Sequence, residues 1–316
     1  MIYMNNLYIG IDTSNYTSSF AVIDDDGTIL KDRRIVLRVP NGKKGLRQEE
    51  AVFQHVTNMP LLLEKNDIDF HKINTIAVST KPRQLSSSYM PVFKVGLSYA
   101  RVISHLSNIP IKLFSHQEGH IASLVYSNDV DENIFIALHL SGGTTEVVLV
   151  NNADNFYTTI LGGTKDLSVG QLIDRIGVYA GLSFPCGGRM EEISRNGKIL
   201  NIDFPKPQQS IWVNLSGLEN YYIKLIDSKK YNIEDIFYTL FFNIALFIER
   251  LIREAITIHH ITSVLIVGGV ISNNIIKNYL SNSFYDVKIY FPEKNLSSDN
   301  AVGIAYLGKY KLGWGD

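Results

Sequence analysis

Two histidines four residues apart are the residues whose spacing most directly suggests chemistry. His116 and His120 belong to the segment His-Gln-Glu-Gly-His, and residues four apart lie on the same face of a helix. Their ring nitrogens could therefore share one metal ion, although an isolated pair of this kind is more often two surface histidines. Asp299, in Ser-Ser-Asp-Asn near the C-terminus, becomes a third ligand only if the fold brings it to the pair. Otherwise an aspartate at the start of a helix is usually an N-cap.

The chemistry of such a site would depend on its open coordination positions. Two imidazoles and one carboxylate leave room for a substrate or phosphate oxygen, and they suit Fe, Zn or Mn alike. A zinc protease motif would place glutamate directly after the first histidine, but Gln117 stands there. A cysteine protease is not supported either, because Cys186 lies in a Pro/Gly turn with no evident base nearby.

Turns rich in glycine and hydroxyl groups form a second set of candidates. One turn between two expected strands consists of Ser141, Gly142, Gly143 and Thr144. Its backbone N–H groups could close on a phosphate, or it could be an ordinary hairpin turn. The corresponding turn of the first half, residues 13–19, also carries many donors, and Asp12 and Ser14 are candidates there. An ATP-type nucleotide, with or without Mg²⁺, could use both turns.

Other candidate contacts to a nucleotide follow later in the chain. Gly268 and Gly269 join an expected strand to an expected helix, where the backbone could approach a nucleotide closely or simply turn sharply. Asn273 comes just after them and could bind a ribose or a base. Asp174 could accept ribose hydroxyls or be a solvated helix charge, and Gly187 belongs to the turn Pro-Cys-Gly-Gly.

The elements that must position these residues occur in one pattern used twice: strand, polar turn, strand, turn, strand, then helices alternating with strands. Expected strands cover 7–12, 20–24, 29–39, 73–79, 109–114, 134–140, 147–150, 156–161, 263–267 and 287–290. Expected helices cover 48–65, 92–106, 166–180, 190–195 and 233–259, and others begin at 116, 274 and 299. We therefore expect two α/β lobes, residues 1–128 and 129–316, with the last helix able to pack back on the N-terminal lobe.

Composition limits the protein classes that fit. The 316 residues exceed the usual size of one domain, and 45% of them are hydrophobic. A net charge of -1 means that any contact with nucleic acid must be local or shared with a partner. The single cysteine excludes an intrachain disulfide and fits a reducing cytoplasm. No signal peptide and no apolar run of about 18 residues is found, so we expect a cytoplasmic protein without a membrane span.

Eight segments, in this order, resemble the TsaD/Gcp/Kae family, the tRNA threonylcarbamoyladenosine synthases formerly labelled O-sialoglycoprotein endopeptidases (peptidase M22-like). The segments are GIDTS (10–14), HQEGH (116–120), LSGGTTEVVLV (140–150), LGG to VGQLIDRIG (161–177), PCGG (185–188), LSGL (215–218), VGGVISNN (267–274) and SSDNAVGIA (297–305). Each is modest alone, but eight in the right order at the right spacing are specific.

The resemblance implies the acetate kinase–sugar kinase–Hsp70–actin (ASKHA) fold, two ribonuclease H-like lobes around a nucleotide and metal cleft. It aligns His116, His120 and Asp299 with the metal ligands, Ser141, Gly142 and Gly143 with the glycine loop, and Asp174, Gly187 and Asn273 with adenosine contacts. The implied activity is an acyl transfer, from threonylcarbamoyl-AMP to N6 of adenosine 37 in tRNAs that read ANN codons. The implied partners are tRNA, a TsaB-like dimerisation partner and a TsaE-like ATPase.

Three loops depart from the family pattern. Asn15-Tyr16-Thr17 stands where the family has the end of a run resembling TSCDET, and Thr144 stands where the family has the histidine of SGGHT. Residues 81–86, which include no glycine, stand where the family has a GPGL-type loop. The residues expected to bind metal and nucleotide thus match the family pattern better than the loops expected to face the acceptor. This is the pattern of a divergent paralogue. Two alternatives stay open: a carbamoyltransferase of the same fold with another acceptor, and a non-catalytic partner subunit. The retained histidines and Asp299 argue against the second.

Overall fold

Two compact units, each built around one α/β sheet, make up the computed structural model. It describes residues 6–14, 16–39, 46–64, 68–128, 130–153, 155–207, 210–291, 296 and 299–313. Unit 1 contains Met1–Asn133, Asn151–Thr158 and Pro292–Asp316, and unit 2 contains Ile134–Val150 and Thr159–Phe291. The C-terminal segment therefore belongs to unit 1, although it follows unit 2 in the sequence.

Unit 1 has a five-stranded sheet in the order β3-β2-β1-β4-β5. Its strands are β3 (Ile29–Val36), β2 (Thr17–Asp24), β1 (Leu7–Thr13), β4 (Ile73–Lys81) and β5 (Ile111–Ser115). The first three strands pair antiparallel, and β1, β4 and β5 pair parallel. Strand β1 is thus central, and it ends at the residues Asp12 and Thr13, next to the turn that contains Ser14.

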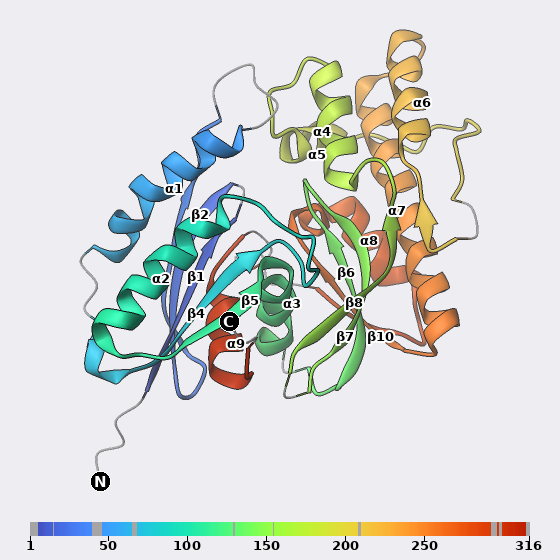
Figure 1. The fold of residues 1–316 in the computed structure, drawn as a ribbon. Coiled ribbons are helices and arrows are strands. Elements are labelled where there is room, and N and C mark those ends of the chain that lie inside the picture. The colour runs from blue at the N-terminus through green and yellow to red at the C-terminus, as the bar shows by residue number, and fades with distance from the viewer. Residues whose placement is uncertain are drawn as a thin grey trace. The chain divides into compact units, whose positions relative to one another are not determined.

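Helices cover both faces of the unit 1 sheet (Figure 1). They are α1 (Gln48–Leu63), α2 (Phe93–Ser107), α3 (His116–Ser127), α9 (Val302–Tyr310) and the short η1 (Phe70–Lys72). Alternate residues of β2 face opposite sides, as a strand requires. Phe20 and Val22 pack in the cluster that also holds Met59 of α1, whereas Ala21 and Ile23 pack with α9.

Unit 2 has a six-stranded sheet in the order β11-β10-β6-β7-β8-β9. The strands are β6 (Ile134–Leu140), β7 (Thr145–Asn151), β8 (Tyr157–Thr164), β9 (Trp212–Val213), β10 (Ser263–Val267) and β11 (Lys288–Tyr290). The helices are α4 (Val169–Tyr179), α5 (Gly187–Ser194), α6 (Ser216–Asp227), α7 (Ile233–His259), η2 (Gly269–Ser272) and α8 (Asn274–Ser283). Helix α7 supplies much of the core, including the fully buried Phe237, Leu240 and Phe241.

The repeated strand and helix pattern expected from the sequence is confirmed, although several elements differ. Strand β9 and helix α6 were not predicted, although Leu218, Tyr222 and Leu225 of α6 recur at helical spacing and pack on the core of unit 2. The last helix begins at Val302 instead of Asp299. None of the helices within the described ranges is long and apolar enough to cross a membrane.

Candidate metal centre and glycine-rich turn

A capping box sets the start of α3 and so places the two histidines. The Glu118 N–H donates to Ser115 Oγ at 3.3 Å, and Glu118 Oε2 accepts from the Ser115 N–H at 2.6 Å. This reciprocal arrangement satisfies backbone donors that the helix start would otherwise leave open. It puts His116 at the first position of α3 and His120 one turn later on the same face.

Close packing of α3 against α9 brings the third residue to the pair. A Cβ atom at Gly303 of α9 would overlap the backbone oxygen of Gly119 in α3, so glycine is required for this approach. Asn300 Oδ1 accepts from the Val302 N–H at 3.0 Å and satisfies the start of α9. Asp299 is therefore not the helix cap that its position suggested, and its carboxylate is directed to the histidines instead.

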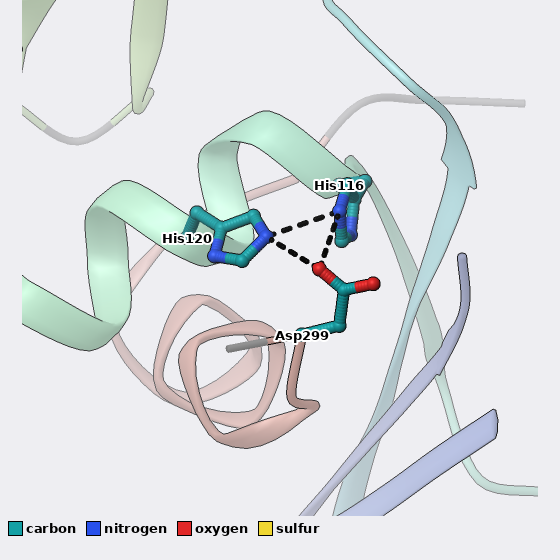
Figure 2. A group of neighbouring side chains, drawn as sticks. All are labelled: His116, His120 and Asp299. Carbon is teal, nitrogen blue, oxygen red and sulfur yellow. Dashed lines mark hydrogen bonds and ion pairs between the residues drawn. The ribbon is translucent and has the colours of Figure 1, made fainter. Parts of the chain in front are cut away.

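The three side chains converge on one point (Figure 2). His120 Nε2 lies 3.1 Å from His116 Nε2 and 3.1 Å from Asp299 Oδ1, and His116 Nε2 lies 3.6 Å from the same oxygen. Edges of this length fit three ligands that each lie about 2 Å from one ion. The side chains of His116, His120 and Asp299 are 15%, 4% and 27% exposed. The donor set thus fits a divalent transition metal, with His120 buried and the other two ligands partly open to solvent.

Two polar residues from the first half of the chain, Asp12 and Ser14, hydrogen-bond to ligand side chains at atoms that do not face the cluster centre. Both carboxylate oxygens of Asp12 lie 3.1 Å from His116 Nδ1, and Asp12 is fully buried. Such a carboxylate fixes the orientation of a metal-binding imidazole and makes it a stronger ligand. Ser14 Oγ donates to Asp299 Oδ2 at 2.8 Å, which leaves Oδ1 directed to the histidines. Both residues were candidates for nucleotide or substrate contacts, and the structure places them beside the candidate ligands.

The carboxylates of Asp12 and Asp299 favour a positive charge at the cluster. Burial lowers the pKa of His116, but the carboxylates of Asp12 and Asp299 outweigh burial and raise it to about 10. Burial raises the pKa of Asp299, but its hydrogen bonds with His116 and His120 hold it well below its usual value. A proton and a metal ion would compete for the same imidazole, so metal binding is expected to release a proton.

In unit 2, the turn between β6 and β7 is held by its own serine. Ser141 Oγ accepts from the N–H groups of Gly143, at 3.3 Å, and Thr144, at 3.0 Å, and the Ser141 N–H donates to the Thr144 oxygen at 2.8 Å. A Cβ atom at Gly142 or Gly143 would meet nothing within 4 Å. One side of the turn is therefore open to a ligand.

The other side of the turn is closely packed. A Cβ atom at Gly170, in the first turn of α4, would lie 2.6 Å from the Ser141 oxygen. Gly268 has φ = 101°, in the region that favours glycine, and its Cβ would overlap the Leu140 oxygen. Gly269 follows at the start of η2. The two glycine turns thus lie side by side in unit 2, as a nucleotide site would need.

Of the remaining nucleotide candidates in the same unit, Asp174 lies in the middle of α4, and Gly187 and Asn273 lie at the starts of helices. Asp174 Oδ1 accepts from the Cys186 N–H at 2.7 Å, directly before Gly187, and burial raises the pKa of Asp174. Asn273 caps α8, because its Oδ1 accepts from the N–H groups of the next helical residues at 3.0 and 3.1 Å. Its Nδ2 is buried and has no hydrogen-bond partner among the described residues. That donor is available to a ligand.

Comparison with known proteins identifies the family. Residues 42–306 match the model of TsaD, the tRNA N6-adenosine threonylcarbamoyltransferase. The chain belongs to the TsaD family. A relative from Caldicellulosiruptor saccharolyticus, named tRNA N6-adenosine threonylcarbamoyltransferase, is 28% identical, with 97% of this chain and 93% of the relative covered.

Solved structures confirm the ASKHA fold expected for the TsaD family. HypF of T. kodakarensis has a TM-score of 0.66 at 13% identity, and the match covers 97% of this chain but only 47% of that longer one. A ROK family glucokinase from Streptomyces griseus, in complex with glucose and AMPPNP, has a TM-score of 0.54 at 11% identity, with 96% and 99% covered. Both are ASKHA proteins, and the likeness concerns the fold alone.

The loops that depart from the TsaD pattern have partners of their own. In the 81–86 loop, Gln84 Oε1 accepts from the Thr158 N–H at 2.9 Å. Thr144 closes the glycine turn through its backbone. Asn15 and the serines at 297 and 298 lie outside the described residues. The 81–86 loop is thus an ordered part of unit 1, different in sequence from the family pattern.

Sequence reasoning missed several residues that support the two candidate sites. Glu191 Oε1 accepts from both the backbone N–H and the Nδ2 of Asn274, at 2.8 and 2.7 Å, and so ties α5 to the start of α8. Asn300 was quoted only as part of a motif. No spacing rule would have found Glu191, because Asn274 lies 83 residues away. Asn300 is a local cap, since its Oδ1 accepts from the N–H group two residues later, so its position before an expected helix was a usable signal.

His55 was also missed, although the sequence held a signal for it. Ala51, His55, Met59 and Leu62 are the buried positions of α1, and they recur at helical spacing. A histidine on an otherwise apolar face must find polar partners in the interior. Such a residue is a candidate for a supporting role near a site.

Proposed function

We propose that this TsaD family member transfers a threonylcarbamoyl group from threonylcarbamoyl-AMP to N6 of adenosine 37 in tRNAs that read ANN codons. The observation that carries the proposal is the cluster of His116, His120 and Asp299, whose ligand atoms all lie within 4.8 Å of one another. It occurs in a chain that matches the family over residues 42–306. A non-catalytic subunit would have no use for this cluster or for the hydrogen bonds that orient it.

In this proposal His116, His120 and Asp299 hold one divalent ion, and Fe, Zn and Mn suit the donors equally. When bound, the ion supplies positive charge for the carbonyl or phosphate oxygen of the donor. Asp12 keeps His116 Nε2 directed to the cluster by accepting a hydrogen bond from Nδ1. Ser14 occupies Asp299 Oδ2 and leaves Oδ1 free for the ion.

Residues of unit 2 would bind the adenylate part of the donor, or ATP with Mg²⁺. The open side of the Ser141–Thr144 turn offers space near a phosphate. The buried, unused Nδ2 of Asn273 can donate to a ribose or base oxygen or nitrogen. Asp174 can accept from ribose hydroxyls, since its second carboxylate oxygen is not needed for the bond to the Cys186 N–H.

A second candidate is a carbamoyltransferase of the same fold with another acceptor. The altered residues favour it: Thr144 stands where the family has a histidine, and the 81–86 loop has no glycine. The residues aligned with the metal ligands, His116, His120 and Asp299, match the family pattern, whereas these two loops differ. The difference concerns what receives the group, and the acceptor therefore has to be identified by experiment.

The test is a transfer assay with the full chain, a donor-forming enzyme, ATP, bicarbonate and ¹⁴C-threonine, with and without TsaB-like and TsaE-like partner proteins. An ANN-decoding tRNA should be labelled at adenosine 37, and Asp299→Ala should abolish the label. The control His105→Ala, which alters an exposed histidine on α2, should not. Label on a protein or small molecule with tRNA untouched would favour the second candidate. No label on any acceptor would contradict both.

A further inference from the structure

A serine at the start of α4 connects this helix to the glycine turn of unit 2. Ser168 is 5% exposed and is the N-cap of α4, because its Oγ accepts from the Gln171 N–H at 3.1 Å. The same hydroxyl donates to the Gly142 carbonyl oxygen at 2.8 Å. A hydroxyl has one proton to donate. One buried side chain thus accepts from the helix and gives its proton to the turn.

The start of α4 also packs directly on the turn. A Cβ atom at Gly170 would lie 2.6 Å from the Gly142 Cα, so glycine is needed in the first turn of the helix. Thr145 Oγ1 accepts from the Val169 N–H at 2.8 Å and satisfies another donor of the same helix start. Two hydroxyl groups therefore hold α4 at this place, and of these two only Ser168 bonds to the Gly142 carbonyl.

The bond from Ser168 sets the direction of the next N–H group. The peptide between Gly142 and Gly143 is trans, and in a trans peptide the N–H points opposite to the carbonyl. Because the Gly142 carbonyl is directed to α4, the Gly143 N–H is directed away from this helix. Its bond to Ser141 Oγ is long, at 3.3 Å, and both glycines are exposed. A ligand on the open side of the turn can therefore accept from this N–H.

We propose that Ser168 is a positioning residue for phosphate binding at the glycine turn: its hydroxyl holds the Gly142 carbonyl on α4, so that the Gly143 N–H faces the open side. Ser168 lies behind the turn and acts through the peptide between two glycines. Glycine adopts many backbone conformations, so the orientation of this peptide depends on such an external bond. The inference rests on the proposed nucleotide site of unit 2 and adds the residue that orients its phosphate contact.

The test compares the binding of AMP and of adenosine, which differ only in the phosphate, by calorimetry with the full chain. Ser168→Ala removes the bond to Gly142 and should weaken AMP binding about five- to tenfold, as the loss of one hydrogen bond does. Its adenosine binding should stay within about twofold of the wild type, because the expected ribose and base contacts lie elsewhere in unit 2. Ser168→Thr keeps the hydroxyl and should bind both ligands within about threefold of the wild type.

Thr145→Val is the matched control for the structural role of Ser168. It removes the acceptor of another N–H at the start of α4 and leaves the bond to Gly142 in place. Both Thr145→Val and Ser168→Ala should lower the Tm by about 2–4 °C, but Thr145→Val should bind AMP as the wild type does.

Three results would overturn the inference: AMP affinity of Ser168→Ala equal to that of the wild type, an equal loss of AMP affinity in Thr145→Val, or an equal loss of adenosine affinity in Ser168→Ala. A wild type that binds no AMP would overturn the proposed nucleotide site, and the inference with it. A wild type that binds AMP while Ser168→Ala binds it equally well would overturn the inference alone.

A spectroscopic measurement reports on the peptide itself. In protein made by cell-free synthesis with ¹³C-carbonyl, ¹⁵N-labelled glycine, a carbonyl–amide correlation arises only from consecutive glycines, and the sequence contains four such pairs: 142–143, 162–163, 187–188 and 268–269. Gly143→Ala removes the first signal and so assigns it. Loss of the hydrogen bond should shift the Gly142 carbonyl signal in Ser168→Ala and leave it in place in Thr145→Val.

An unshifted Gly142 signal in Ser168→Ala would overturn the inference even if its AMP affinity falls. Should Ser168→Ala not fold, Ser168→Gly takes its place in both experiments. Glycine is nearly as good an N-cap as serine and carries no hydroxyl, so this variant loses the bond to Gly142 while the helix start is largely kept.

Discussion

The metal cluster of unit 1 and the glycine turn of unit 2 are built in opposite ways. His116, His120 and Asp299 come from distant parts of the chain and are held by close helix packing and by buried hydrogen bonds. The turn at Ser141–Thr144 is local, and its own serine accepts the N–H groups that shape it. Its two glycines are exposed, whereas His120 is 4% exposed.

The difference follows from what each region would bind. A small divalent ion needs ligand atoms fixed within tenths of an ångström, and contacts between distant parts of the chain hold these atoms in place. A phosphate is larger and accepts hydrogen bonds from backbone groups, so a short turn with an open side is enough. Substitutions in the metal cluster should therefore lower both metal binding and stability. Substitutions in the glycine turn should weaken ligand binding with little effect on stability.

The largest effect is expected from removing a ligand of the cluster. His116→Ala and Asp299→Ala should each weaken metal binding more than about 100-fold, since residues that merely orient ligands already cost 10–100-fold. The measurement is metal content by inductively coupled plasma mass spectrometry after dialysis against a known free metal concentration. His105→Ala, an exposed histidine on α2, is the control and should keep its metal. Unchanged metal content in both ligand variants would remove the metal assignment.

One added methyl group in each region gives the sharpest test of the comparison. Gly303→Ala places a Cβ atom on the backbone oxygen of Gly119 and should cost about 2–3 kcal/mol of stability. Hydrogen exchange should show the loss in α3 and α9. Gly143→Ala meets nothing within 4 Å and should change stability by less than about 0.5 kcal/mol, while it weakens AMP binding measured by calorimetry. A stable Gly303→Ala protein, or a destabilised Gly143→Ala protein, would contradict the proposed difference.

Local patterns predicted most of the fold. Strands β1 and β2 alternate between faces, α7 carries a long apolar stripe, and α3 begins at His116 as expected, with Ser115 as its cap. Helix α6 was overlooked, although Leu218, Tyr222 and Leu225 recur at helical spacing and pack on the core of unit 2. The start of α9 was misplaced because Asp299 looks like a cap, whereas Asn300 satisfies the helix N–H groups.

The candidate site was predictable only in its local part. The two histidines share a helix face because they are four residues apart, and this spacing can be read directly from the sequence. Asp299 lies 179 residues after His120, and only the family resemblance connected them. The roles of Asp12 and Ser14 as partners of the ligands depend on how β1 packs near α3 and α9. The nucleotide contacts expected at Asp174, Gly187 and Asn273 stay predictions.

A smaller loss of stability than at Gly303 is expected at Asp166, whose carboxylate orders unit 2 after the glycine turn. Its carboxylate accepts from the N–H groups of Leu167, Leu215 and Ser216 at 2.7, 2.8 and 2.9 Å. Burial raises its pKa, but these bonds outweigh burial and lower it to about 2.

The folded pKa lies below the unfolded value of about 3.9. The contribution of Asp166 is therefore complete above that pH and is lost as the pH falls toward 2. Asp166→Asn should cost about 1 kcal/mol at pH 7 and progressively less as the pH falls from about 4 through 2, measured by urea unfolding across this range. Asp286→Asn alters an exposed carboxylate of the same unit and should leave the curve unchanged. If Asp166→Asn and the wild type lose stability in parallel on acidification, the carboxylate does not supply this order, and the local construction of unit 2 must come from its backbone hydrogen bonds and glycines alone.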